Sequence, residues 1–186
     1  MCAPRDARHE SGVTLIELVM FIVVVGVAAA GIVGVIGYAT RASVDPMTQK
    51  QALAVAEAVL EEVRLMPFTY CDPDDANAAS ADSAAACTTA EGIGPEGGEN
   101  RTAGPLYFDN VSDYSGFAVN PITDIAGNAI AGLTGYAAAI TVENQGFGGV
   151  AAADSLLITV TVTHPNLNPG IVLHGYRVRY APNALP

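Results

Sequence analysis

Hydrophobic and polar positions divide the chain into four zones. The first, residues 1–12, is short and polar. The second, residues 13–38, is apolar almost throughout, interrupted only by Thr14 and Glu17, and it is long enough to span a bilayer as a helix. Four glycines in this zone are typical of membrane helices, where they let neighbouring helices approach: Gly26, Gly31, Gly34 and Gly37. The pattern predicts a membrane helix that packs among other such helices.

The third zone, residues 39–67, predicts an amphipathic continuation of the same helix. Its apolar positions recur at helical spacing, namely Val55, Val59, Val63 and Met66, widened by Leu53 and Leu60. Its polar positions are Lys50, Glu57, Glu61, Glu62 and Arg64. Pro46 predicts a kink or a short break near the start, and Pro67 predicts the end. We therefore expect one long, bent helix over residues 13–66.

The last zone, residues 68–186, predicts a globular region that begins with an irregular surface loop over residues 68–105. A short helix near residues 76–86 is compatible with the alanine and serine content of that loop. Three segments then alternate as strands, namely residues 136–143, 155–164 and 171–180, and turns rich in glycine and proline join them. Such strands favour an antiparallel sheet. Because this sheet and the amphipathic helix each need an apolar partner, we expect an α+β fold in which they pack together.

The net charge of the chain argues against two classes of binding partner. Nineteen acidic and eight basic residues give a formal net charge of -11, which repels phosphate backbones, so nucleic acid is not an expected partner. Lys50 is the only lysine, and there is no polybasic patch to dock on anionic lipid headgroups. Membrane attachment is therefore expected to come from apolar residues.

The start of the apolar zone closely resembles the processing site of type IV prepilins and of type II secretion pseudopilins. The residues that carry this resemblance are Ser11, Gly12, Val13, Thr14, Leu15, Ile16, Glu17 and Leu18. The resemblance implies that a membrane-embedded aspartic prepilin peptidase cuts between Gly12 and Val13, removes residues 1–12 as a leader, and N-methylates Val13. It also implies that residues 14–18 act in assembly.

Glu17 carries the main physical argument within this string. A carboxylate inside a membrane span costs several kcal/mol and is retained only with a partner. A cut after Gly12 creates a cationic amine at Val13, about one helical turn from Glu17. In pilins that this chain resembles, the glutamate is thought to neutralise the terminal amine of a neighbouring subunit. Such a pair would set the register of the filament.

Two alternatives to this interpretation remain. The apolar run that ends in Ala28, Ala29 and Ala30 is also compatible with a secretory signal that has a small-residue cleavage site. A plain single-span anchor without processing is the other alternative. The mass of the mature chain separates all three.

Further segments resemble minor pilins of the mannose-sensitive haemagglutinin (MSHA) system, namely residues 43–46, 52–62, 111–116, 157–164 and 175–180. The resemblance implies the type IV pilin form of the α+β fold and a non-enzymatic role in filament assembly or priming. It implies as partners other pilin subunits, the prepilin peptidase and the inner-membrane assembly machinery. It also implies residence in the bacterial inner membrane, with the globular region periplasmic, before transfer to a surface pilus. A type II secretion pseudopilin and a membrane-tethered adhesin or sensor remain alternatives.

The cysteines are Cys2, Cys71 and Cys87, and the first belongs to the expected leader. The other two flank a polar, alanine-rich loop, and no histidine nearby suggests a zinc site. We expect a disulfide between Cys71 and Cys87, worth roughly 3 kcal/mol by the chain-entropy model. Two free thiols in a reducing compartment are the alternative.

No catalytic, cofactor or metal site is expected from the sequence. His164 and His174 both fall on predicted strands and outside any catalytic motif, so we expect structural roles for them. Asp72, Asp74 and Asp75 offer oxygens suited to calcium, but they lack the EF-hand spacing. Whether this acidic run binds calcium is left open.

Overall fold

The computed structural model describes residues 12–104 and 106–185, with the backbone alone for residues 39–45. Two compact units make up the chain, Met1–Val44 and Asp45–Pro186. The helix α1 (Leu15–Leu65) begins in the first unit and ends in the second. Residues 1–11 of the expected leader, with Cys2, lie outside the described residues.

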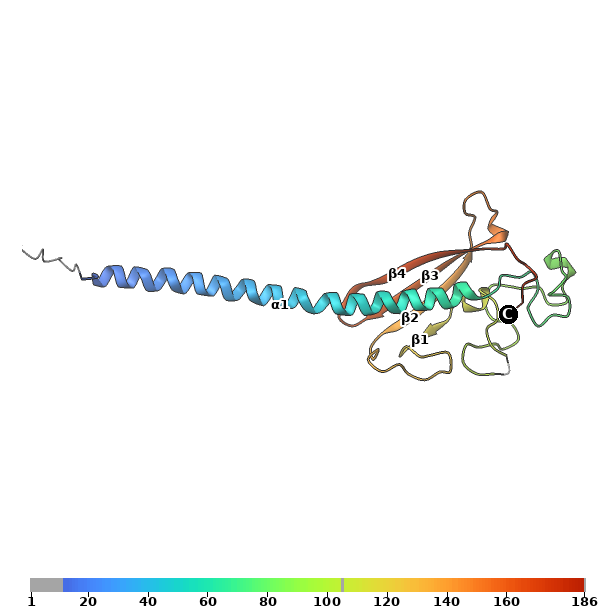
Figure 1. Ribbon diagram of the computed structural model, residues 1–186, viewed down its shortest axis with the longest axis horizontal. Helices are drawn as coiled ribbons and strands as arrows, with labels where there is room; N and C mark the ends of the chain where they lie inside the picture. The colour runs from blue at the N-terminus through green and yellow to red at the C-terminus, as the bar shows by residue number, and fades with distance from the viewer. Residues whose placement is uncertain (1–11, 105, 186) are drawn as a thin grey trace, which may run out of the picture. The chain divides into compact units, whose positions relative to one another are not determined.

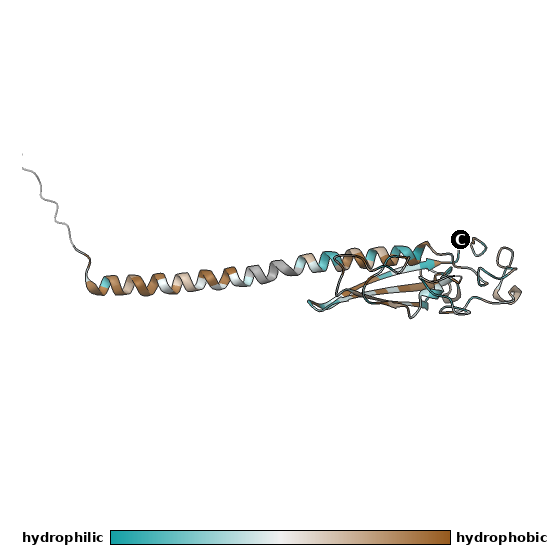
Figure 2. Cartoon of the chain, turned by 90° about the horizontal axis from the view of Figure 1, so that it is seen from below, coloured by the Kyte–Doolittle hydropathy of each residue, from teal (hydrophilic) through white to brown (hydrophobic). Residues whose placement is uncertain are grey.

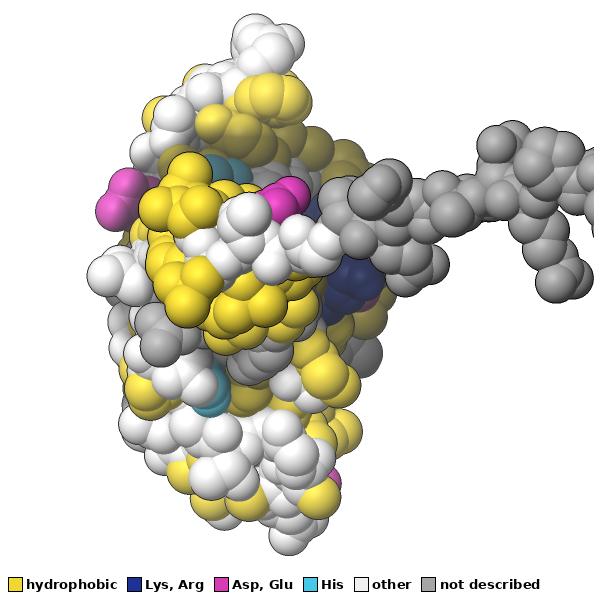
Figure 3. Space-filling model, turned by 90° about the vertical axis from the view of Figure 1, so that its left-hand side faces the viewer, with side chains coloured by type: hydrophobic (Ala, Val, Ile, Leu, Met, Phe, Trp, Pro, Cys, Tyr) yellow, Lys and Arg dark blue, Asp and Glu magenta, His cyan; other side chains and the backbone are white. Residues whose placement is uncertain are grey.

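The first unit contains the apolar part of α1. Its stretch Leu15–Tyr38 is long and apolar enough to cross a membrane, and none of it is buried within this chain. Figure 2 shows the hydrophobic colouring along this stretch, and hydrophobic side chains surround the helix when it is viewed end-on in Figure 3. A helix that is apolar all round needs a surrounding of lipid or of other helices.

The second unit contains the amphipathic part of α1. The helix continues through Pro46, so the sequence expectation of a short break there is wrong. A proline removes one backbone hydrogen bond, but the turns on either side can still propagate the helix. The helix ends at Leu65, two residues before Pro67, as the sequence predicts.

A four-stranded antiparallel sheet forms the rest of the regular structure (Figure 1), in the order β1-β2-β3-β4. Its strands are β1 (Ala118–Val119), β2 (Ala137–Asn144), β3 (Ser155–His164) and β4 (Leu167–Val178). The three predicted strands are confirmed, with β4 starting earlier than expected. The strand β1 was not predicted, because two residues are too few to show an alternation of apolar and polar positions. Three single turns of 3-10 helix complete the chain, namely η1 (Ala84–Ala86), η2 (Ser112–Tyr114) and η3 (Ala152–Asp154). The helix expected near residues 76–86 is reduced to η1.

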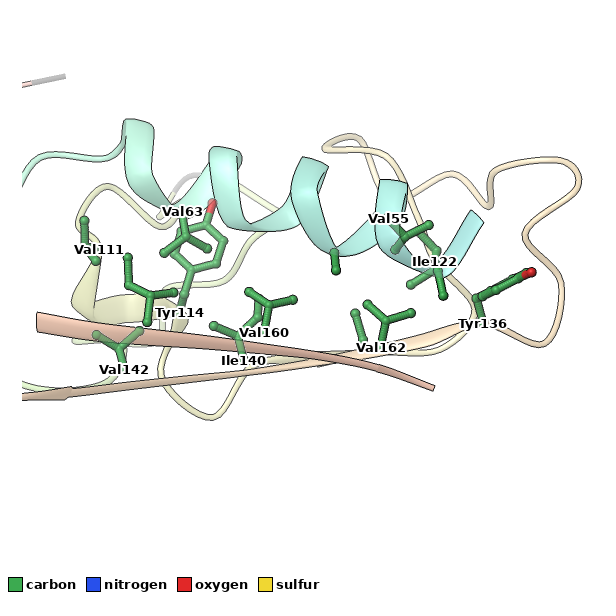
Figure 4. Close-up of a cluster of buried hydrophobic side chains, with 14 of the residues drawn as sticks. Val55, Val63, Val111, Tyr114, Ile122, Tyr136, Ile140, Val142, Val160 and Val162 are labelled. Carbon is green, nitrogen blue, oxygen red and sulfur yellow. The ribbon is translucent and has the colours of Figure 1, made fainter. Parts of the chain in front are cut away.

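The core of the second unit lies between α1 and the sheet, as Figure 4 shows. The apolar positions of the central strands are fully buried, namely Ile140, Val142, Leu156, Ile158, Val160 and Val162. From the helix, Val55 and Val63 are buried, whereas Leu53 is 38 % exposed and does not belong to the core face. Two alanines of the helix, Ala52 and Ala56, are also fully buried. Their small side chains let the helix approach the sheet closely, which hydrophobicity alone did not indicate.

A glycine on β4 continues this close approach. A Cβ atom added at Gly175 would lie 3.0 Å from Cδ1 of Leu60 and 3.4 Å from Cδ of Arg64. A larger side chain at this position would require the side chains of Leu60 and Arg64 to shift. The fold is therefore an α+β arrangement in which one helix packs on one antiparallel sheet.

Candidate functional site

The N-terminal string starts with three non-helical residues, and α1 begins at Leu15. The Thr14 hydroxyl accepts a hydrogen bond from the Glu17 backbone N–H (3.4 Å), and the Thr14 carbonyl accepts one from the Leu18 N–H (3.1 Å). Thr14 is therefore the N-cap of the helix, and Glu17 occupies the position that glutamate favours in a capping box. The string thus has a local structural role in addition to the one that sequence resemblance implies.

The carboxylate of Glu17 is the only charge within the Leu15–Tyr38 stretch. Among the described residues it forms no ion pair. Its place in the first turn is favourable, because the helix dipole stabilises negative charge there. Among the described residues, the helix dipole is the stabilising feature that the structure gives this carboxylate.

The Gly12–Val13 peptide lies in open space. A Cβ atom added at Gly12 would meet nothing within 4 Å, and Val13 is exposed. The remaining predicted assembly residues, Leu15, Ile16 and Leu18, are also exposed apolar side chains on the first turns of α1. The bond between Gly12 and Val13 thus lies outside the helix, and no other described residue covers it.

The glycines of the apolar stretch also face open space. A Cβ atom at Gly26, Gly31, Gly34 or Gly37 would have no neighbour within 4 Å. No other part of the described chain therefore packs against these glycines.

Cys71 and Cys87 form the expected disulfide, with their Cα atoms 5.4 Å apart. Around it lies a small separate core, in which Ala78 and Ala81 are buried and Tyr70 is half-buried. The loop that the sequence predicted as surface thus has an interior of its own. Asp75 holds this loop together, because its carboxylate accepts hydrogen bonds from the backbone N–H groups of Asn77 (2.8 Å) and Thr89 (2.5 Å). Those bonds lower the pKa of Asp75.

Six carboxylates gather beside this loop in two groups of three. One group is Glu91, Glu96 and Asp113, and the other is Asp72, Glu99 and Asp109. Within each group the oxygens lie within 4.8 Å of one another. Of the acidic run noted in the sequence, only Asp72 joins a group. The other members come from irregular segments whose spacing carries no recognisable metal motif, so sequence reasoning missed them.

Burial and mutual repulsion raise the pKa values of several of these carboxylic acids. Loss of solvent, followed by the charges of neighbouring carboxylates, raises the pKa of both Glu99 and Asp109 to about 7. Burial also raises the pKa of Glu91 and of Asp113. Like charges this close favour either a bound proton or a bound cation.

An ion pair that the sequence did not indicate links the helix to the loop before η2. Glu62 was expected on the polar face of the helix, but its carboxylate accepts two hydrogen bonds from Arg101, from Nε (2.6 Å) and Nη2 (2.7 Å). The Tyr114 hydroxyl donates to the same carboxylate (3.0 Å). Beside this pair, an apolar groove runs between α1 and residues 122–133, lined among others by Val59 and Ile125.

The two histidines lie on strands, as predicted. His164 packs against the Tyr136 ring, with ring centroids 4.4 Å apart, and His174 Nδ1 lies 2.9 Å from the Thr159 hydroxyl. Neither has a carboxylate partner among the described residues. These contacts are those of structural side chains.

The chain was compared with family models, curated proteins and solved structures. No family model, no curated protein and no solved structure matches the chain.

Proposed function

We propose that the chain is a minor subunit of a type IV pilus of the MSHA kind, most similar to the D subunit of that system. In this proposal a prepilin peptidase removes residues 1–12 and methylates Val13. The subunit then waits in the inner membrane with its globular unit in the periplasm, until it enters or primes a filament. In this proposal, the α+β arrangement of helix and sheet is a pilin fold.

The observation that carries this proposal is a carboxylate in the first turn of α1, within the stretch Leu15–Tyr38 that is otherwise apolar and not buried in this chain. Placing Glu17 in hydrocarbon without a partner is costly, and the described part of the chain provides no cation for it. Cleavage before Val13 would give every subunit a terminal amine about one helical turn from its Glu17. An amine from one subunit can then neutralise the carboxylate of the next and set the register of their helices.

The local geometry supports a cut at this bond. Thr14 is the N-cap, so a chain that begins at Val13 keeps its capping hydrogen bonds intact. Removal of the leader therefore leaves the helix start unchanged. A cut two residues further on, after Thr14, would remove the cap.

The exposed surface of the span supports polymerisation. Its glycines have open space in this chain, and small residues of this kind let membrane helices pack closely. In a filament, the neighbouring subunits would supply the packing partners and replace the lipid.

The test compares Glu17→Ala and Glu17→Gln with a control, Glu57→Gln, which changes an exposed glutamate on the same helix. We expect the wild type and the control to lose residues 1–12, gain one methyl group and enter sheared surface filaments. The Glu17 variants should remain in the membrane fraction. Normal incorporation of both Glu17 variants, or a mature wild-type mass that retains the leader, would overturn the proposal.

Two other functions keep the same membrane helix. A type II secretion pseudopilin would share the processing, and the subunits that co-purify with the chain distinguish it from a pilus subunit. A tethered adhesin or sensor is favoured by one observation, the apolar groove between α1 and residues 122–133. Such a tethered domain would keep its function in Glu17→Ala.

A further inference from the structure

The carboxylates of Glu91, Glu96 and Asp113 converge from three places on the chain. Glu91 follows the disulfide loop, Glu96 lies in the glycine-rich turn, and Asp113 lies in η2. One oxygen from each lies within 4.8 Å of the other two. That separation leaves room for an ion that all three contact, because calcium–oxygen bonds are about 2.3–2.6 Å long.

Asp113 is the buried member of this group, at 1 % exposure. Its Oδ2 accepts hydrogen bonds from the backbone N–H groups of Asp109 (2.9 Å) and Asn110 (2.7 Å). Its Oδ1 is buried and has no hydrogen-bond partner. A buried carboxylate oxygen without a partner is costly, so it indicates a ligand that the protein atoms do not supply.

The two glutamates are held in a similar way. The Ser112 hydroxyl donates to Oε1 of Glu91 (2.6 Å), while Oε2 of Glu91 is buried without a partner. The Gly92 backbone N–H donates to Oε1 of Glu96 (2.8 Å). In each carboxylate, therefore, the protein fixes one oxygen and positions the side chain before any ion arrives.

No ion pair among the described residues neutralises this charge, although Arg179 attracts Glu91 at longer range. None of the three carboxylates forms an ion pair, and the second group, Asp72, Glu99 and Asp109, adds negative charge beside them. In that second group, Oε2 of Glu99 is likewise buried without a partner. Six acids in one region of the unit without a paired base would destabilise it strongly unless a cation or protons neutralised them.

We propose that Glu91, Glu96 and Asp113 bind one calcium ion. The donors are all oxygens, which suits a hard cation, and the group contains no histidine or cysteine to favour zinc. Glutamates on irregular loops tolerate the variable geometry of calcium better than the strict octahedron of magnesium. Neither the donors nor their positions depend on the function proposed above.

The ion would link three segments that lack regular structure. It joins the turn after the disulfide loop and the glycine-rich turn to η2, whose Tyr114 belongs to the main core. The calcium site would thus complete what the disulfide begins, since both fix the irregular half of the unit to the helix and sheet.

The experiment uses the full chain in detergent after treatment with EDTA and dialysis. Calcium chloride or magnesium chloride is titrated in by calorimetry, and thermal unfolding is measured with each salt. We expect calcium to bind with a dissociation constant of about 10⁻⁴–10⁻³ M, the range of extracellular modules. We also expect it to raise Tm by roughly 3 °C or more at tenfold excess over that constant, with a smaller effect of magnesium.

Two variants and one control test the assignment. Glu96→Gln keeps the shape of the side chain at a half-exposed position, and Asp113→Asn removes the buried charge. Each should weaken calcium binding about tenfold or more. The control, Glu143→Gln, changes an exposed glutamate on β2 and should bind like the wild type. If calcium has no effect up to 10 mM (roughly tenfold above the upper limit expected), or if both variants bind calcium as the wild type does, the assignment is wrong.

Discussion

The pair Glu62–Arg101 allows a quantitative test of how the helix is attached to the rest of the globular unit. The two side chains are 20 % and 8 % exposed, and two parallel N–H···O bonds join them. Arg101 also donates through Nη1 to the Asp124 carbonyl (3.0 Å). The perturbation is Glu62→Gln, which removes the charge and keeps the size of the side chain.

The expected cost follows from this geometry. Removing one partner of a buried ion pair costs about 3–5 kcal/mol, because the other charge stays buried without compensation. Glu62 keeps some contact with solvent, and glutamine still offers an oxygen to the Tyr114 hydroxyl. We therefore expect a loss of about 2 kcal/mol. For a chain of this size that loss corresponds to a Tm lower by roughly 6 °C.

A double-mutant cycle isolates the interaction between the two residues. Arg101→Met loses the bonds to Asp124 both alone and in the double variant, so that loss cancels in the cycle. The double variant should be at least about 1 kcal/mol more stable than the sum of the single changes predicts. Near-UV circular dichroism is a suitable probe, because the chain has no tryptophan and six of its seven tyrosines, all except Tyr38, lie in Asp45–Pro186.

The control for this cycle is Glu57→Gln, on the exposed side of the same helix, which should change stability by less than about 0.5 kcal/mol. Additive effects of the two single changes, to within about 0.5 kcal/mol, would refute the reasoning. In that case the pair would be a surface contact of little energetic weight.

Three further predictions concern the same unit. Gly175→Val should lower stability by about 1–3 kcal/mol, because its side chain would overlap Leu60, and a Tm unchanged from wild type would contradict the close approach of strand and helix. Cys71→Ala should cost roughly 3 kcal/mol, and reduction of the wild type should add two hydrogens to its mass; an unchanged mass would disprove the disulfide. In EDTA, Tm should rise as the pH falls from about 8 to about 5, since a folded-state pKa of about 7 at Glu99 and Asp109, above the unfolded value, makes the folded state bind more protons in this window. A Tm that falls over this range would show that these acids are not perturbed as described.

Local patterns in the sequence were sufficient to predict the long helix and the three longer strands. Each of these patterns involves residues that are close in sequence. They are the apolar run of residues 13–38, the helical spacing of Val55 and Val63, and the alternation in β3. Because such periods reflect which side of an element is buried, they predicted one helix and three strands of an α+β fold. The cap that Thr14 forms was not anticipated from the sequence, although Thr14 and Glu17 have the three-residue spacing of an N-cap and its partner.

Contacts between distant segments could be decided only by the tertiary structure. Glu62 and Arg101 are 39 residues apart, and no period in an irregular loop shows which charge will meet the helix. The acidic group of Glu91, Glu96 and Asp113 forms for the same reason, since the chain path and not the spacing brings the oxygens together. Sequence alone therefore determined the membrane-length helix and the three longer strands of the sheet. The fold determined which charges are buried, because burial depends on what packs above each residue.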